Sequence, residues 1–314
     1  MSEAEKYAVV VGSLNCDTIY LQDRLPERGE TYFAREAALA SGGKGANQAA
    51  QLGRLGLKTY MIGKVGPDIF GGYLTGELSK SGVDVRHVAV GAAASGLAAI
   101  HTMRDGSVYA TVAPGANMEL TVGEIEELRP LITGASVLVL QMEIPRAVTE
   151  YAFRMAKSAG VYVVFNAAPA LEVDRGVLTG ADCLIVNETE AAGYLQVKDI
   201  ASPQAAAAAG LEFVKAGGNT LIITLGSQGS VLVHGRETRH FPVDLGLGAV
   251  ETTGCGDSYV GAFAYQKAMG ADDETACAFA SAASQLTATG VGAQPAMPDL
   301  AAVRRALASS RSTR

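Results

Sequence analysis

The sequence predicts an α/β fold with a doubly wound, mainly parallel sheet, and two observations carry that prediction. Short apolar runs typical of buried strands alternate along the chain with longer segments of helical pattern. Glycine or polar residues follow one apolar run after another. Because the carboxyl ends of parallel strands meet at one edge of the sheet, these residues are expected to gather there and to form a ligand site.

Composition and charge exclude several classes of partner. The 314 residues are 48% hydrophobic, which is enough for a large core, and they carry a net charge of −7 without a block of basic residues. Neither nucleic acid nor an anionic membrane is therefore expected as a partner. No apolar run in the sequence is long enough to span a bilayer. The polar, acidic residues 1–6 do not resemble a secretory signal, so we expect a cytoplasmic protein.

The chain shows no internal repeat and no clear interdomain linker, so residues 1–314 are expected to form one large domain. Its 4 cysteines are scattered and form no CxxC pair, and its 4 histidines show no zinc-site spacing. Reduced thiols in the cytosol fit this pattern best.

The first apolar run, residues 8–13, is typical of a buried parallel strand, and Asn15 and Asp17 stand just past its end. Residues 18–22 and 31–40 are expected to pair as strands outside the main alternation. This pair is compatible with a flap over the site and with a surface hairpin that has no function.

Residues 41–56, SGGKGANQAAQLGRLG, combine a glycine-rich approach with an alanine-rich helix, and Lys44 and Asn47 fall near its first turn. The stretch is not a Walker A loop, because neither Ser nor Thr follows the lysine and the glycine spacing is wrong. It is not a dinucleotide fingerprint either, since Gln48 occupies the position of the last glycine. A helix start with a cation and an amide suits a polyol or a phosphate, and a purely structural glycine turn is equally compatible.

The middle of the chain continues the alternation. Strands are expected over residues 58–64, 86–90, 96–103, 107–112, 136–141, 161–165, 183–186 and 220–225, and helices over residues 69–81, 121–132 and 146–158. Asp105-Gly106 predicts a hairpin turn between two of these strands. Glu143 stands just past the end of the strand expected over residues 136–141.

The most informative stretch is residues 251–258, ETTGCGDS, which leads into an apolar helix expected over residues 258–269. The glycines on either side of Cys255 allow a tight turn, and the N–H groups at the helix start attract an anion. A carboxylate there, Asp257, suggests a general base beside a phosphoryl group that the amides hold. The alternative is a glycine turn in which Asp257 or Ser258 is an ordinary helix N-cap, and this stretch taken alone favours that alternative.

Four motifs in one order resemble the PfkB-type carbohydrate kinases and, within that family, the ribokinase-type chains. The motifs are GGKGANQ at residues 42–48, Asn187-x-x-Glu190, TLGS at residues 224–227 and GCGD at residues 254–257. The resemblance covers almost the whole chain. Because four motifs in order are far more specific than one, they favour the general base over the N-cap for Asp257.

The resemblance implies a ribokinase-like three-layer αβα sandwich with a small β lid formed by about residues 15–41 and 95–113. It implies transfer of the γ-phosphoryl group of ATP to a sugar hydroxyl, with D-ribose to ribose 5-phosphate as the leading reaction. The alternatives are a nucleoside kinase or another sugar kinase of the family, and a non-catalytic sugar-binding sensor. The intact Asp257 with its glycine turn argues against the sensor.

The resemblance also implies roles residue by residue. Asp257 is the catalytic base and touches the sugar. The backbone amides of the anion hole belong to Gly254, Cys255 and Gly256. The other sugar-binding residues are Asn15, Asp17, Gly43, Lys44, Asn47 and Glu143. The ATP-binding residues are Asn187, Thr224, Gly226, Ser227, Gly229 and Ser281, and Glu190 organises magnesium indirectly.

Two further expectations come from the same resemblance. A monovalent cation, most simply potassium, is expected beside the anion hole, with Glu251 where the family has an aspartate. Its other ligands would be the carbonyls of Thr253, Thr287, Gly290 and Gly292. A homodimer is expected through the lid, because the lid strands carry apolar residues on both faces, namely Ile19, Leu21, Tyr32, Phe33, Leu97 and Ile100.

Overall fold

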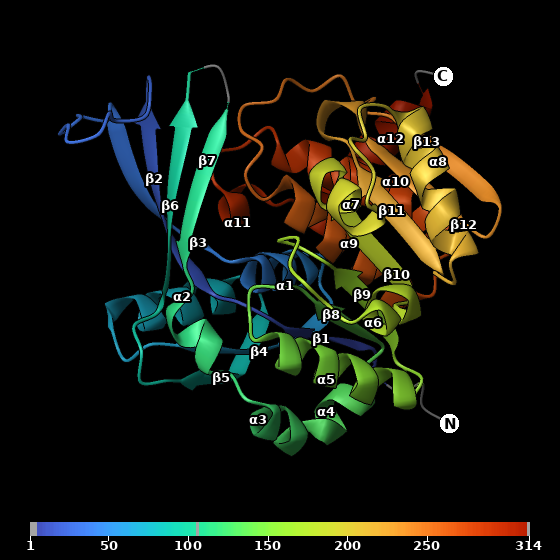
Figure 1. Cartoon of the computed structure of the whole chain (residues 1–314), viewed down its shortest axis with the longest axis horizontal. Helices are drawn as coiled ribbons and strands as arrows, with labels where there is room; N and C mark the ends of the chain where they lie inside the picture. Colours follow the sequence, from blue (N-terminus) through green and yellow to red (C-terminus); the bar gives the residue numbers. More distant parts are fainter. Residues whose placement is uncertain (1–4, 105–106, 313–314) are drawn as a thin grey trace.

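The computed structural model describes residues 5–104 and 107–312 (Figure 1). Its main feature is a 9-stranded sheet in which all neighbours from β11 to β5 run parallel, while β12 and β13 are added antiparallel at one edge. In spatial order the strands are β13 (Glu237–Phe241), β12 (Ser230–His234), β11 (Thr220–Thr224), β10 (Cys183–Asn187), β9 (Tyr162–Asn166), β8 (Val137–Leu140), β1 (Tyr7–Val11), β4 (Lys58–Val65) and β5 (Val83–Val90).

Helices cover both faces of this sheet. One face is covered by α1 (Lys44–Arg54), α2 (Ile69–Lys80), α9 (Cys255–Met269), α10 (Asp273–Thr287) and α12 (Leu300–Ser312). The other is covered by α3 (Val122–Glu127), α4 (Arg129–Thr133), α5 (Arg146–Ser158), α6 (Arg175–Gly180), α7 (Glu188–Leu195) and α8 (Pro203–Lys215). Three shorter elements are η1 (Gly115–Glu119), η2 (Gly226–Gln228) and α11 (Ala293–Ala296).

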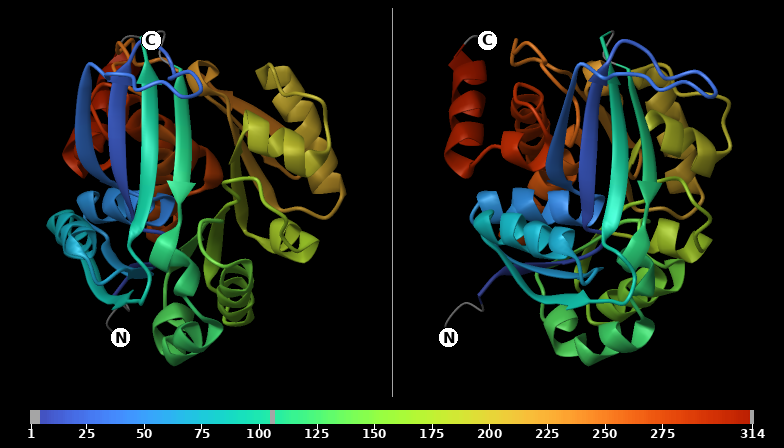
Figure 2. Two further views of the ribbon diagram at one scale, coloured as in Figure 1. Left: turned by 60° about the vertical axis from the view of Figure 1, so that its left-hand side comes forward. Right: turned by 90° about the vertical axis from the view of Figure 1, so that its left-hand side faces the viewer.

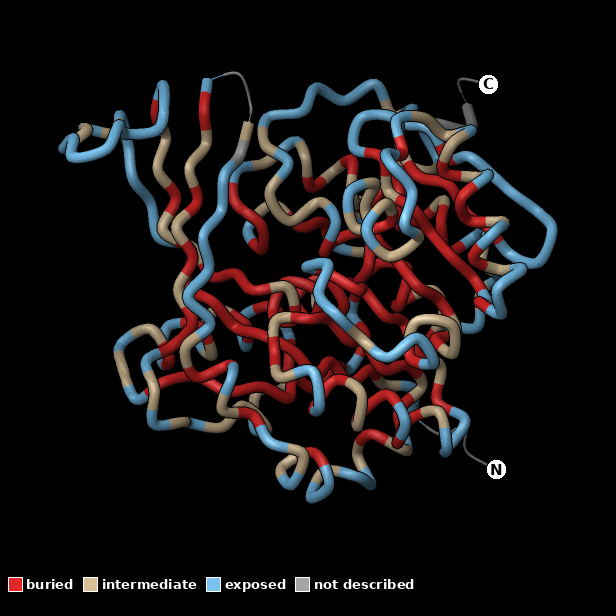
Figure 3. The backbone as a smooth tube through the Cα atoms, in the orientation of Figure 1, coloured by how far each residue is buried: buried red, intermediate tan, exposed pale blue. Residues whose placement is uncertain are grey.

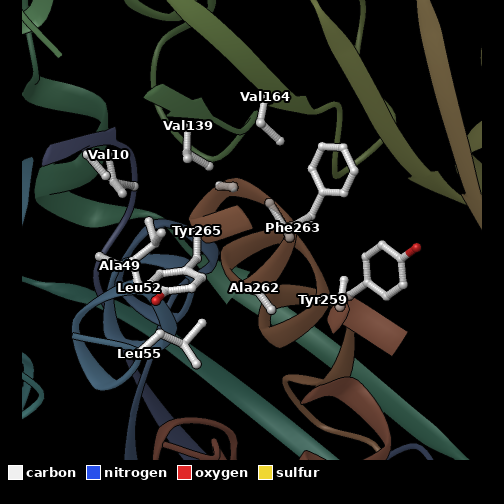
Figure 4. Packing of buried hydrophobic residues seen from close by; sticks show 14 of the residues in the cluster. Val10, Ala49, Leu52, Leu55, Val139, Val164, Tyr259, Ala262, Phe263 and Tyr265 are labelled. Carbon is white, nitrogen blue, oxygen red and sulfur yellow. The ribbon is translucent and has the colours of Figure 1, made fainter. Parts of the chain in front are cut away.

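The strands are apolar throughout because each contributes to a core on either side. In β1, Ala8 and Val10 belong to the core shared with α1 and α9, whereas Val9 and Val11 belong to the opposite core. This is the burial expected of a parallel strand enclosed by helices. Figure 4 shows part of the first core, to which β1, α1 and α9 contribute Val10, Leu52 and Phe263. The predicted three-layer αβα architecture is confirmed.

A second, 4-stranded sheet projects from the main body (Figures 1 and 2). Its order is β3 (Glu36–Gly42), β2 (Asn15–Gln22), β6 (Gly96–Met103) and β7 (Val108–Ala113), with β2 and β6 parallel. Ile19 and Ile100 are paired in register at 7% and 8% exposure, so both are buried and neither adds to an exposed surface of the lid. The outer end of the sheet is largely exposed (Figure 3).

Several predicted boundaries were wrong. Residues 31–35 do not belong to a strand, and β3 begins only at Glu36. The single helix expected over residues 121–132 is two helices that meet at Leu128, because Pro130 in the first turn of the second cannot donate a backbone hydrogen bond. The turn predicted at Asp105-Gly106 lies outside the described residues.

The helix expected from residue 258 begins earlier, at Cys255. Its N-cap is Gly254, with φ 77°, which a glycine adopts without strain. Asp257 therefore lies in the first turn, and the reading of Asp257 or Ser258 as the N-cap is wrong. Within residues 5–104 and 107–312, no helix is both long and apolar enough to cross a membrane.

Candidate active site

The order of the strands places the site. In the main sheet, β1 has β4 as its neighbour on one side and β8 on the other. Beyond β8, strands β9, β10 and β11 extend the sheet in order. Ligands of open α/β sheets bind outside the carboxyl ends of the strands at such a switch point. The segments that follow β1 and β8 meet there, because Ser13 Oγ donates to Glu143 Oε2 at 2.5 Å.

A cavity of about 150 Å³ opens at this edge of the sheet. Its lining combines the start of α1, the ends of β9, β10 and β11, and the start of α9. The lining residues are Lys44, Asn166, Ala168, Ile185, Val186, Asn187, Glu190, Thr224, Gly254, Gly256, Asp257 and Val260. The structure therefore brings seven predicted site residues together in one cavity, including both glycines of the expected anion hole.

The starts of α1 and α9 face this region, and each begins at a glycine of positive φ. Gly43, with φ 89°, is the N-cap of α1, and a Cβ there would lie 2.7 Å from the backbone nitrogen of Asn15. No other residue type could bring the helix so close to the segment after β1. At the start of α1 the N–H groups of Lys44, Gly45 and Ala46 already donate to Glu143 Oε2, Ser13 Oγ and the Ser13 carbonyl, so the start of α9 is the helix N-terminus that suits an anion.

Asp257 lies 9% exposed at the first turn of α9, and amides hold both of its carboxylate oxygens. Asn47 Nδ2 donates to Oδ2 at 2.9 Å, and Gln48 Nε2 donates to Oδ1 at 2.9 Å. Each oxygen keeps a second lone pair for another donor. The side chain is thus oriented by the protein and still able to accept a hydroxyl proton.

Glu143 organises the predicted sugar side. Besides the Ser13 hydroxyl, its Oε2 accepts the backbone N–H of Lys44 at 3.1 Å and Asn15 Nδ2 at 3.4 Å. Asn117, fully buried in η1, donates to Asn15 Oδ1 at 2.8 Å and so turns the amide nitrogen of Asn15 toward Glu143. The predicted residues Asn15, Lys44 and Glu143 therefore form one connected cluster.

The carboxylates around the site change the titration of their neighbours. Burial, together with the charges of Glu143 and Asp257, raises the pKa of Asp17 to about 7. Burial opposes the charged form of Lys44, but the carboxylates of Asp257, Glu143 and Glu190 outweigh it and raise the pKa of Lys44. Lys44 is therefore a cation at neutral pH inside a cluster of carboxyl groups.

Cys255 lies between the two glycines of the anion hole, and its thiol is not activated. Burial raises the pKa of Cys255 to about 11, and the carboxylates of Glu251 and Asp257 contribute to the rise. A thiol that stays protonated is a poor nucleophile. Its backbone N–H donates to the carbonyl of Thr252 at 3.2 Å, and the predicted role of that amide in the anion hole stays a prediction.

On the expected nucleotide side, Asn187 and Glu190 form a capping box at the start of α7. Asn187 Oδ1 accepts the N–H of Glu190 at 2.8 Å, and Glu190 Oε2 accepts the N–H of Asn187 at 2.9 Å. Burial raises the pKa of Glu190, and the charge of Asp257 adds to the effect. Within the described residues there is no cluster of three His, Cys, Asp or Glu side chains placed to hold a metal ion.

Other predicted nucleotide residues lie outside the cavity that holds Asp257. Gly226, Ser227 and Gly229 follow β11, and the first two are exposed. Ser281, on α10, lines a separate cavity of about 310 Å³ opposite residues 239–245. Thr224, the residue before this loop in the predicted nucleotide set, does line the cavity that holds Asp257.

Glu251 and three of the four predicted carbonyl residues for a monovalent cation come together. Glu251 Oε2 accepts the N–H of Gly292 at 2.8 Å, while Oε1 is buried without a partner. Gly290 donates its N–H to the carbonyl of Thr287 at 3.1 Å. Thr287 is the last residue of α10, so its carbonyl lies at the C-terminal end of that helix. An unpaired buried carboxylate oxygen fits a bound cation, because leaving it unpaired is costly.

Sequence reasoning missed the amides that support Asp257. Gln48 was given no role of its own at the site, yet it is fully buried and donates to the carboxylate. Gln141 and Asn166 both contact Gln48, at 2.6 Å and 3.0 Å. Each stands at the end of a strongly apolar strand, and a polar residue at such a position was the available signal.

Comparison with known proteins identifies the family. The model of the pfkB family carbohydrate kinases matches residues 5–300. The chain belongs to that family. Ribokinase of Mus musculus is 35% identical over 82% of this chain and 80% of its own length, and deoxyribokinase of Salmonella typhi is 31% identical over 93% and 95%.

A solved structure of a family member supports the same assignment. The structure of Arabidopsis thaliana ribokinase complexed with ribose and ATP superimposes with a TM-score of 0.86 at 31% identity, covering 97% of this carbohydrate kinase and 99% of the plant chain. The predicted resemblance is therefore confirmed, and the enzyme is a phosphotransferase that acts on a sugar hydroxyl.

Proposed function

We propose that this kinase transfers the γ-phosphoryl group of ATP to D-ribose and forms ribose 5-phosphate. The observation that carries the proposal is the position of Asp257, which lies at the start of α9 within a cavity that Lys44 also lines. Around it stand the residue types of a polyol site, a carboxylate cluster with oriented amides. The ribose and ATP in the structure of the plant relative support the same pair of substrates.

The proposed reaction needs one proton acceptor and several groups that stabilise negative charge. The sugar hydroxyl oxygen forms a bond to the γ-phosphorus, the bond from that phosphorus to the β–γ bridging oxygen breaks, and the hydroxyl proton passes to Asp257. The backbone amides of Gly254 and Gly256 would stabilise charge on the transferring group, and the amide of Cys255 would join them on release from the Thr252 carbonyl, to which it donates at 3.2 Å. Lys44 adds a positive charge on the sugar side.

Positioning is the larger part of this catalysis, because loose phosphoryl transfer asks little covalent chemistry of the protein. Asn15, Asp17 and Glu143 would bind sugar hydroxyls, and Asn47 would join the sugar site to the base. Every hydroxyl buried without a partner would be costly, so a dense set of oxygens and amides suits a polyol.

Nucleotide and magnesium complete the proposal. Asn187 and Thr224 line the cavity, whereas Gly226, Ser227, Gly229 and Ser281 would contact more distant parts of ATP. Glu190 would hold magnesium indirectly, since its half-buried carboxylate lines the same cavity as Asp257. Magnesium, when bound, neutralises charge on the β- and γ-phosphates.

We also propose a potassium site at Glu251. The unpaired Oε1 supports a cation there, and the carbonyls of Thr253, Thr287, Gly290 and Gly292 would be its other ligands. Hard oxygen ligands suit such an ion. Glu251 is one methylene longer than the aspartate of the family pattern, yet Gly292 already holds its other oxygen in place.

A homodimer formed through the lid is the proposed assembly. Apolar side chains remain exposed on the lid, with Phe33 at 89%, Leu39 at 59% and Tyr109 at 52%. Exposed apolar groups that lie close together mark interaction surfaces more often than isolated ones do. We further propose a cytoplasmic location, which the 4 free cysteines support.

A coupled assay of ADP release over pentoses, hexoses and nucleosides tests the proposed function. The deoxyribokinase relative makes 2-deoxyribose the first alternative acceptor to include. A nucleoside that exceeds every sugar in kcat/KM would favour a nucleoside kinase. Sugar binding without any ADP release would favour the sensor.

A further inference from the structure

Asp257 stands at the meeting point of two lines of side-chain amides. In the first line, Gln141 Nε2 donates to Gln48 Oε1 at 2.6 Å, and Gln48 in turn donates to Asp257. In the second, Gln294 Nε2 donates to Asn47 Oδ1 at 3.1 Å, and Asn47 in turn donates to Asp257. Every donor in both lines therefore points toward the carboxylate.

A fifth amide, that of Asn166, fixes the direction of the first line. Gln48 Nε2 also donates to Asn166 Oδ1 at 3.0 Å, and Asn166 uses its own amide nitrogen on the carbonyl of Ile185 at 2.9 Å. If the amide of Gln48 were reversed, its oxygen would face two acceptors and its nitrogen would face the donor of Gln141. Gln48 is 0% exposed, so no solvent could compensate for those losses.

We propose that Gln48 is a positioning residue for phosphoryl transfer, because it fixes the orientation of the Asp257 carboxylate while Gln141 holds Gln48. The inference rests on the proposed role of Asp257 as the base. Gln48 does not line the cavity, so it acts on the reaction only through Asp257. Asn47, by contrast, belongs to the residues proposed to bind the sugar.

Two physical effects follow from this contact. A hydrogen bond donated to a carboxylate favours its ionised form, which is the form that accepts a proton. A fixed orientation keeps the accepting oxygen near the sugar hydroxyl, and a displacement of about 1 Å can cost about 100-fold in rate. Loss of Gln48 therefore moves the ionisation of the base to higher pH and leaves its accepting oxygen less well placed, while the sugar ligands stay in place.

The charged and titratable groups that face Asp257 come from three other elements and from α9 itself. They are Lys44 on α1, Asp17 on β2, Glu190 on α7 and Cys255 on α9 itself. None of them is hydrogen-bonded to Gln48 among the contacts of the described residues. A neutral substitution of Gln48 leaves their charges unchanged, so a change in the pH profile reports the lost amide.

The test compares Gln48→Met with Gln51→Met in the same helix. Gln51 is also 0% exposed, but it accepts from Ser258 and donates to the carbonyl of Pro298 rather than to Asp257. We expect Gln48→Met to lower kcat on the order of 10- to 100-fold. The KM for D-ribose stays within about 3-fold, and the acid limb of the pH profile of kcat moves to higher pH. Gln51→Met lowers the melting temperature without moving the acid limb.

Asp257→Asn, assayed in parallel, separates this inference from the proposed function. If Asp257→Asn is inactive while a folded Gln48→Met has the parental kcat and acid limb, the positioning role is overturned and the base assignment stands. If Asp257→Asn stays active, the base assignment itself is wrong, and the inference falls with it. If Gln48→Met does not fold, Gln141→Met takes its place, and an unchanged acid limb in that variant overturns the inference.

Discussion

Asn47 Nδ2 donates to Asp257 Oδ2 at 2.9 Å, although 210 residues separate the two in the sequence. The contact joins the first turn of α1 to the first turn of α9. The helix expected to bind the sugar and the helix expected to bind the phosphoryl group thus share one carboxylate. A hydroxyl placed against Asp257 would lie at the boundary of the two sites, where transfer must occur.

Asp257→Asn is expected to lower kcat on the order of 10²- to 10⁴-fold, because asparagine is nearly isosteric but cannot accept the hydroxyl proton. Binding of D-ribose should be comparatively unaffected. The measurement is kcat together with sugar affinity by calorimetry. Asp272→Asn is the matched control, since Asp272 only caps α10. Activity of Asp257→Asn within a few-fold of the parent would show that the hydroxyl is deprotonated in another way.

Asp17→Asn is expected to stabilise the ligand-free protein at pH 8 while it weakens sugar binding. The pKa of Asp17 is raised from 3.8 to about 7 in the folded state, mainly by burial. Between those values the folded state binds more protons at Asp17 than the unfolded state does, so the free energy of unfolding falls as pH rises. Replacing the carboxylate by an amide is therefore expected to raise the free energy of unfolding at pH 8 by no more than about 4 kcal/mol.

Thermal melts of the parent and of Asp17→Asn from pH 4 to pH 8 check this prediction. The difference in melting temperature should be largest at pH 8 and should shrink toward pH 4, where the carboxyl group is neutral in the folded state. Asp174→Asn serves as a control on an exposed helix cap. A difference that is constant across the pH range would contradict the assigned titration of Asp17.

Potassium is expected to raise kcat/KM through the site at Glu251. The assay keeps magnesium fixed and replaces potassium chloride by tetramethylammonium chloride at equal ionic strength. Glu251→Gln removes the charge but keeps an acceptor for the N–H of Gly292, so it should weaken the response to potassium. An unchanged kcat/KM on replacing potassium would mean that the longer side chain has abolished the site or taken over the role of the ion.

A lid-mediated dimer should be visible by sedimentation at micromolar concentration. Phe33→Glu combined with Leu39→Glu places charges on the most exposed apolar residues of the lid and should shift the protein toward monomer. Leu171→Glu is the control, because Leu171 is 51% exposed and lies outside the lid. A parent protein that sediments only as monomer would refute the proposed assembly.

Much of the fold could be predicted because local patterns determine it. The helix expected over residues 146–158 and the strand expected over residues 96–103 have those bounds in the structure, since apolar periodicity and flanking turn residues mark both. The glycines of the two site motifs were also informative. At Gly43 and Gly254 the positive φ leaves glycine as the unstrained choice.

What could not be predicted depends on contacts between distant segments. Gln141 and Gln48 are 93 residues apart, and Gln294 and Asn47 are 247 apart, so no local pattern announces either pair. The early start of α9 escaped prediction for a different reason. Its N-cap is a glycine whose contribution is conformational, and it has no side chain that would mark a cap in the sequence.

The central claim is that this carbohydrate kinase phosphorylates D-ribose with ATP. The most direct test is the kcat/KM for ADP release across a panel of D-ribose, 2-deoxyribose, hexoses and purine nucleosides, with product identification for the best acceptor. We expect D-ribose to have the highest kcat/KM and to yield ribose 5-phosphate. A hexose, a nucleoside or 2-deoxyribose that is turned over more efficiently, or the absence of ADP release with every acceptor, would contradict the claim.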